Sequence, residues 1–327
     1  MIEIGVGTFD TNCLRPAPPD RSLPTLVSQI VPILLMINLK GGVGKTASTV
    51  AIAETFAEQG QRVLVIDADH QSMAGELLVG QSRMLMAERT KKTLHDMFLA
   101  MADVNFDAVE LPKFALPNAS SVQTATDNLS VVPCSFRIDD FSSNVARSRR
   151  ICRSYATERG LQTYLARQMR KVERWLSTHY DIVLVDCPPS IAMQVKMFLR
   201  IADGYVIPCV PDQLSVRGSA NLVKRMAGYG FKLAGLGTLW TLYREQVALH
   251  REMVRDPFTR IPTPFQTIIP NATRLAAAVD PRGVNAPFSN CDAKYGKPFA
   301  TRYRELVDEL FARCERVGIE TRVVHYV

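Results

Sequence analysis

A glycine-rich turn between an apolar run and a helical segment constrains the fold of this chain most strongly. The turn is Lys40-Gly-Gly-Val-Gly-Lys-Thr46; it follows the apolar residues 33–37 and precedes a helical pattern over residues 46–59. Free backbone N–H groups and the helix dipole at such a turn favour a phosphate chain. Leu39 stands where the strict pattern has glycine. We predict a nucleotide-binding loop; the alternative is a tight turn without a ligand.

Each position of this turn has an expected role. The glycines let the backbone approach the phosphates, Lys45 can reach the β- and γ-phosphates, and Thr46 can offer its hydroxyl to Mg²⁺. The expected ligand is therefore ATP or GTP with Mg²⁺. The expected nucleotide-binding residues of the loop are Lys40, Gly41, Gly42, Val43, Gly44, Lys45, Thr46 and Ala47.

Two further apolar runs end in carboxylates. Asp67 and Asp69 close the run over residues 62–66, and Asp186 closes the run over residues 182–185. Because parallel strands present their carboxyl ends at one edge of a sheet, these acids should lie beside the glycine-rich turn. A solvated residue at a strand end would explain any one acid alone. Three strands with suitable ends favour nucleotide binding with Mg²⁺, and Asp186 would hold the ion through water.

The alternation of strand-like and helix-like segments predicts the α/β class, with a mostly parallel twisted sheet and helices on both faces. No internal repeat is visible, so we expect a single domain over residues 31–327 after an irregular N-terminal extension, residues 1–30. The sequence pattern of residues 80–178 predicts secondary structure less clearly. The expected strands are 33–37, 62–66, 129–132, 182–185, 205–207 and 236–242, and the expected helices are 46–59, 93–101, 161–177, 215–226 and 301–317.

The charge of the chain favours an acidic partner. The net charge is +7 and the pI about 9.1, and nine basic residues face two acidic ones between Arg147 and Arg174. Nucleic acid or an anionic membrane surface would fit this charge.

The seven cysteines include no CxxC pair, which is typical of a reducing cytosol. The apolar run 23–37 is too short to span a bilayer and lacks the basic start of a signal peptide, so we expect a cytoplasmic protein.

The motifs KGGVGKT, DADHQ, DCPPS and IPCVPDQLSVRG together resemble the ParA/MinD family of deviant Walker P-loop ATPases. Within that family the chain is most similar to the ParA (Soj-type) partition ATPases, over nearly all residues from Ile33 onward. The resemblance implies that ATP binding forms a homodimer and that slow hydrolysis, stimulated by a ParB-like or cargo-adaptor protein, dissolves it. The chain departs from the family pattern at Ala47 and His70, and its segment 236–242 lacks the asparagine that often contacts adenine.

The resemblance also implies roles for single residues. Lys40 matches the signature lysine that reaches the phosphates of the partner subunit, Asp69 the residue that orients the attacking water, and Asp67 a residue of the metal–water network. The expected catalytic residues are thus Lys40, Lys45 and Asp69. The strand end expected along the adenine contains Pro208, Pro211 and Asp212.

The resemblance to ParA proteins also implies that the ATP dimer binds DNA without sequence preference, mainly through phosphate contacts. For any single basic residue, a solvated surface charge is the simpler explanation. The cluster between Arg147 and Arg174 is a further candidate. The expected DNA-binding residues are Lys224, Arg225, Arg251, Arg255 and Arg260.

The expected function is partition of plasmid or chromosome DNA, or positioning of another cargo on the nucleoid. A MinD-like ATPase would instead bind membrane through a C-terminal amphipathic helix. Here a core-packed helix followed by a strand over residues 319–327 explains the sequence better, so we expect no membrane contact. An iron-protein-like reductase would need Cys134 and Cys187 as cluster ligands, and ordinary core cysteines are the simpler explanation. A P-loop biosynthetic ligase or kinase would need a substrate pocket that the sequence does not indicate.

Overall fold

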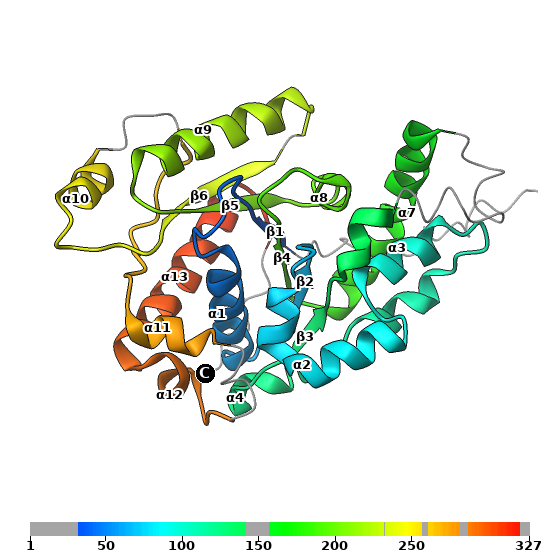
Figure 1. Ribbon diagram of the computed structural model, residues 1–327, viewed down its shortest axis with the longest axis horizontal. Helices are drawn as coiled ribbons and strands as arrows, with labels where there is room; N and C mark the ends of the chain where they lie inside the picture. Colours follow the sequence, from blue (N-terminus) through cyan, green and yellow to red (C-terminus); the bar gives the residue numbers. More distant parts are fainter. Residues whose placement is uncertain (1–31, 142–156, 232, 257–260, 281–286, 321–327) are drawn as a thin grey trace, which may run out of the picture.

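The computed structural model describes residues 32–141, 157–231, 233–256, 261–280 and 287–320 (Figure 1). These residues form one six-stranded sheet in the order β3-β2-β4-β1-β5-β6, and every neighbouring pair is parallel. The predicted α/β class with a parallel sheet is therefore confirmed. The strands are β1 (Ile33–Met36), β2 (Val63–Asp67), β3 (Leu129–Val132), β4 (Ile182–Asp186), β5 (Gly204–Cys209) and β6 (Ala234–Trp240).

Helices cover both faces of the sheet, because the strands are apolar on both faces (Figure 1). In β1, Leu34 and Met36 pack in one core layer and Ile33 and Leu35 in the other. The layer under Leu34 contains α1 (Lys45–Glu58), α2 (Met73–Arg89), α4 (Gln123–Thr126), α12 (Cys291–Tyr295) and α13 (Lys297–Arg316). The opposite layer contains α3 (Leu94–Ala102), α7 (Glu158–His179), α8 (Met193–Phe198) and α9 (Gln213–Gly228).

The register of the sheet brings the predicted motifs to one edge. Met36 lies opposite Asp186 on one side of β4, and Asp67 lies opposite Asp186 on the other. The strands β1, β2 and β4 therefore end at the same level, and the loop after β1 leads into α1 at that edge. This edge is where ligands bind in open α/β sheets.

The predicted strand and helix bounds agree with the structure to within a few residues, except at two places. The strand expected over residues 236–242 is wrong at its end: β6 stops at Trp240, because Thr241 Oγ1 donates to the Val43 carbonyl at 2.8 Å and Leu242 takes φ +51°. Several helices were not predicted: α2, which has a break at Gly80 (φ +75°), the short helices α4, α8 and α12, and α10 (Ala248–Arg255) and α11 (Thr273–Ala278).

Several predictions fall outside the described residues. These are the N-terminal extension, the part of the basic cluster before residue 157, Arg260, and the C-terminal strand beyond residue 320. Within the described ranges, no helix has the length and apolar character needed to cross a bilayer.

Candidate nucleotide-binding site

The glycine-rich loop has the backbone geometry that phosphate binding requires. Gly42 and Gly44 take left-handed φ values of +70° and +76°, which residues with a side chain adopt only with strain. The N–H groups of Gly42, Val43 and Gly44 donate to no backbone or side-chain acceptor among the described residues. Since backbone donors normally find a partner, these groups are available to an anionic ligand at the start of α1.

Lys45 places its ammonium group inside this loop. The side chain is buried, and its Nζ donates to the Lys40 carbonyl at 3.0 Å. Burial lowers the pKa of Lys45, an effect that the carboxylates of Asp186 and Asp69 oppose. A phosphate group would therefore supply both a counter-charge and a second acceptor for this amine.

Thr46 and Asp186 form the centre of the expected magnesium site. Thr46 Oγ1 donates to Asp186 Oδ2 at 2.7 Å, and Thr49 Oγ1 donates to Asp186 Oδ1 at 3.2 Å. Burial raises the pKa of Asp186 to about 7, although the hydrogen bond from Thr46 and the charge of Lys45 act in the opposite direction. A hydroxyl and a carboxylate are oxygen ligands of the kind that Mg²⁺ takes together with phosphates and water.

Asp67 is less accessible than its expected role requires. The carboxyl group is fully buried and accepts the N–H groups of Asp69 at 3.1 Å and Gly75 at 2.9 Å. Burial and the neighbouring Asp186 raise the pKa of Asp67 well above its usual range. Asp67 thus fixes the turn that carries Asp69, and its share in a metal–water network stays a prediction.

The proton on Asp186 gives a pH prediction for the protein without nucleotide or Mg²⁺. Because its pKa rises from 3.8 to about 7 on folding, the native state binds more protons between pH 4 and 7, so the free energy of unfolding falls as pH rises through that window. We expect Asp186→Asn to raise the free energy of unfolding at pH 8 by roughly 2 kcal/mol or more. Urea unfolding at pH 4 and pH 8 measures this change, and an equal gain at both pH values would contradict it.

Asp69 lies on the open side of the loop. Its Oδ1 accepts the Gln71 N–H at 3.0 Å, and Asp69, His70 and Gln71 line a cavity together with Lys45 and Thr46. His70 Nδ1 is 3.7 Å from Asp69 Oδ1 and 3.7 Å from Asp139 Oδ2. The expected water-orienting carboxylate therefore lines the same cavity as the phosphate loop.

Lys40 is held within its own chain. Its Nζ donates to Asp212 Oδ2 at 3.0 Å and Oδ1 at 3.2 Å, and to Ser215 Oγ at 2.7 Å. Asp212 also caps α9, because its Oδ1 accepts the Ser215 N–H at 2.8 Å. The signature lysine and the first turn of α9 are thus joined by one carboxylate.

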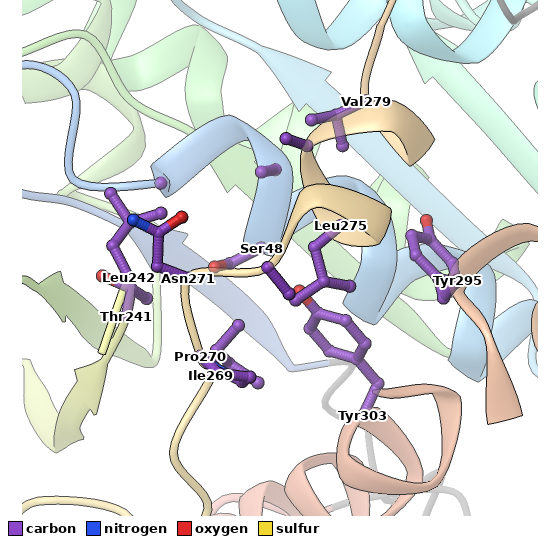
Figure 2. Close-up of a pocket in the computed structure, with 14 residues that line it drawn as sticks. Ser48, Thr241, Leu242, Ile269, Pro270, Asn271, Leu275, Val279, Tyr295 and Tyr303 are labelled. Atoms are coloured by element: carbon purple, nitrogen blue, oxygen red, sulfur yellow. The ribbon is translucent and has the colours of Figure 1, made fainter. Parts of the chain in front are cut away.

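A second cavity opens beside Ala47 (Figure 2). Its wall is mostly apolar and brings together the end of β6, the segment before and within α11, and the rings of Tyr295 and Tyr303. A pocket of this kind, next to the phosphate loop, fits a flat heterocyclic base. Its other polar side chains are Ser48, Thr241 and Asn271. When the amide oxygen of Asn271 faces Arg244, this oxygen accepts hydrogen bonds from Arg244 Nε at 2.7 Å and from Arg244 Nη2 at 2.8 Å.

The residues expected along the adenine are Pro208, Pro211 and Asp212, and that role stays a prediction. The Pro208 carbonyl accepts from Asn38 Nδ2 at 2.7 Å, Pro211 is buried, and Asp212 binds Lys40. Neither these two prolines nor Asp212 lines the second cavity. Sequence reasoning missed Thr241 and Asn271, for which the only signal was their place just after the last parallel strand and just before α11.

The other predicted residues are positioned as follows. Lys224 and Arg225 are exposed on α9, and Arg251 and Arg255 are exposed on α10. Cys134 and Cys187 are fully buried, and burial raises the pKa of both thiols well above the usual range. Both cysteines pack in the apolar layer with α3 and α7, as core residues do.

The fold and the loop together define the class of this protein. A parallel strand leads through a glycine-rich loop into a helix that carries Lys45 and Thr46, and Asp186 lies on the adjacent strand within hydrogen-bonding distance of Thr46. This arrangement is that of a P-loop nucleoside triphosphatase. Residues 31–229 match the AAA domain family (AAA_31), and the chain belongs to this family as a P-loop ATPase of the ParA/MinD type. Membership implies nucleotide hydrolysis.

Known proteins resemble the chain along most of its length. The Chromosome-partitioning ATPase Soj of Treponema pallidum is 27% identical over 285 residues, which cover 86% of this chain and 97% of that protein. A plasmid partition protein of Borrelia burgdorferi, solved with AMPPNP, has a TM-score of 0.61 at 19% identity, and the match covers 86% of this chain and 99% of that protein's chain. Cobyrinic acid a,c-diamide synthase of Mycobacterium smegmatis has a TM-score of 0.62 at 20% identity, and the match covers 90% of this chain and 100% of the synthase chain. The two solved structures show that the fold is shared.

Proposed function

We propose that this protein is a ParA-type ATPase that dimerises on binding ATP, binds DNA without sequence preference, and hydrolyses ATP slowly to partition DNA or to position another cargo on the nucleoid. The observation that carries the proposal is that Lys45, Thr46 and Asp69 line one cavity, and that Thr46 donates to the buried carboxylate of Asp186 behind it. The relatives named Soj and ParA support the partition role. A biosynthetic enzyme shares the fold, so the fold alone does not carry this role.

The residues present fit ATP and Mg²⁺ as ligands. The loop offers free N–H donors and the Lys45 amine to phosphates, Thr46 and Asp186 offer oxygens to a hard cation, and the cavity beside Ala47 offers an apolar wall to a base. The solved plasmid partition protein was crystallised with AMPPNP, and the synthase with an ATP analogue and magnesium. Asp69 would position the water that attacks the terminal phosphate.

Lys40 connects the nucleotide site to the proposed dimer and to α9. In the single chain its amine is paired with Asp212, with the lysine and aspartate side chains 38% and 26% exposed. To reach the phosphates of a partner subunit, Lys40 would have to leave Asp212, which caps the helix that carries Lys224 and Arg225. Dimerisation would in this way change the contacts of a helix expected to bind DNA.

The test of this function is retention of DNA with ATP, with ADP and without nucleotide. A labelled duplex of mixed sequence should bind at least about tenfold more tightly with ATP than with ADP, because two subunits present their basic residues together, and binding should weaken steeply with salt. Size-exclusion chromatography under the same conditions should show a dimer only with ATP. ATP-dependent binding to anionic vesicles without any binding to DNA would contradict the proposal and favour the MinD-like alternative.

A further inference from the structure

The helix α7 separates apolar and basic residues onto opposite faces. Its buried face packs into the core layer with α3 and α8. The buried apolar residues are Leu161, Leu165, Met169, Val172, Trp175 and Leu176. The exposed side chains include four arginines, Arg159, Arg167, Arg170 and Arg174, which we call the α7 ridge.

The spacing of the α7 ridge keeps its arginines on one side of the helix. Arg159, Thr163 and Arg167 follow one another at intervals of four residues. Arg170 lies three residues after Arg167, and Arg174 lies four residues after Arg170, so all of them share one side of the helix. At 1.5 Å per residue, the ridge extends about 22 Å from Arg159 to Arg174. Lys171 is not part of it, because its Nζ donates to the Phe106 carbonyl at 3.2 Å and lies over the Phe106 ring.

Within the described residues, no carboxylate forms an ion pair with any of the four arginines. In the described part of the chain, the arginines that form ion pairs are Arg62, Arg137, Arg304 and Arg313, and none belongs to the ridge. The exposed acid Glu173 lies beside the ridge in sequence and forms no ion pair with it. Four unpaired guanidinium groups on one straight helix produce a concentrated positive potential.

We propose that the α7 ridge is a second DNA-binding surface that contacts phosphates of duplex DNA in the single chain, without ATP. The ridge consists of arginines, with Thr163 between two of them, and among the described residues no exposed large apolar side chain lies on α7. A protein interface or a membrane-binding helix would have apolar or aromatic residues at its centre, whereas a surface that contacts DNA phosphates is polar and cationic. The length of about 22 Å corresponds to roughly two-thirds of a turn of B-DNA.

This surface is separate from the nucleotide site. No residue of α7 lines the phosphate-loop cavity or the cavity beside Ala47. The ridge is also distinct from the expected DNA-binding residues on α9 and α10. A contact through α7 therefore needs neither a bound nucleotide nor a second subunit, and it would keep a chain near DNA after hydrolysis.

The test uses the full chain with Arg167→Gln, Arg170→Gln and Arg174→Gln combined, since Gln preserves helix propensity at exposed positions. Fluorescence anisotropy with a mixed-sequence duplex, in ADP and without nucleotide, gives the dependence of the binding constant on salt. Wild-type protein should show weak, salt-sensitive binding. The triple variant should have a log–log salt slope smaller by roughly 2–3, because each lost phosphate contact removes about 0.9.

The matched control removes the same charge from another exposed site, through Arg89→Gln, Lys91→Gln and Lys92→Gln at the end of α2. This control should keep the wild-type slope, and both triple variants should keep ATP hydrolysis and the gain in DNA affinity with ATP. A wild-type slope in the α7 variant would overturn the inference while leaving the partition function intact. Loss of binding to anionic vesicles, or to an acidic partner protein, with DNA binding unchanged would also overturn it. Failure of ATP-dependent dimerisation in wild-type protein would instead count against the proposed function.

Discussion

Replacing Lys45 by alanine is expected to abolish ATP binding. The Lys45 amine is the one buried cation among the residues that line the phosphate-loop cavity, and a phosphate would receive from it a charge-assisted hydrogen bond in a partly dehydrated site. Such a bond contributes about 1.5–3 kcal/mol, and the loss of charge compensation adds to it, so we expect at least a hundredfold weaker binding. Isothermal titration calorimetry with ATP and Mg²⁺ measures the change.

The variant should remain folded, because burial already lowers the pKa of Lys45 and, among the described residues, its amine donates to the Lys40 carbonyl alone. Lys45→Met, which retains the aliphatic stem, should lose ATP binding as completely as Lys45→Ala. Lys40→Ala provides a matched control in the same loop: it should leave nucleotide binding by the single subunit largely intact and impair turnover. Ordinary heats of ATP binding by Lys45→Met would show that the loop does not hold phosphates as proposed.

The sequence was sufficient to predict the part of the site that contiguous motifs encode. The predicted loop residues lie between the end of β1 and the first turn of α1, and Asp67 and Asp186 end adjacent parallel strands, since a buried strand followed by a polar residue has few other arrangements in an α/β fold. The hydrogen bond between Thr46 and Asp186 joins residues 140 positions apart, yet both motifs pointed to it. The parallel sheet followed from the order of the strands.

The base-sized cavity could not be predicted in the same way. Thr241 and Asn271 belong to no motif, and they reach Ala47 only because β6 stops at Trp240 and the chain returns through α11. The pairing of Lys40 with Asp212 spans 172 residues and depends on where α9 begins. α2 was missed because the break at Gly80 interrupts its helical period, and contacts of this kind depend on tertiary packing that local patterns do not contain.

Asp69→Ala is expected to lower ATP turnover about 10²- to 10⁴-fold while ATP binding persists, so that an ATP-loaded dimer accumulates. The loss follows because Asp69 lines the same cavity as Lys45, where a carboxylate can orient and deprotonate water; a general base typically contributes an effect of this size. The remaining loop should bind ATP normally, because Asp69 donates nothing to the phosphates. Phosphate release under saturating ATP and light scattering of the ATP-bound species measure the two effects.

The matched control is Asp139→Ala, which removes the other carboxylate 3.7 Å from His70 but does not line the cavity. If Asp69 acts only through the charge of His70, both variants should lose turnover equally. If Asp69 acts on water, Asp139→Ala should keep most of the wild-type rate, and only Asp69→Ala should accumulate the dimer. A fully active Asp69→Ala enzyme would refute the assignment, because no other carboxylate of the described chain lines that cavity.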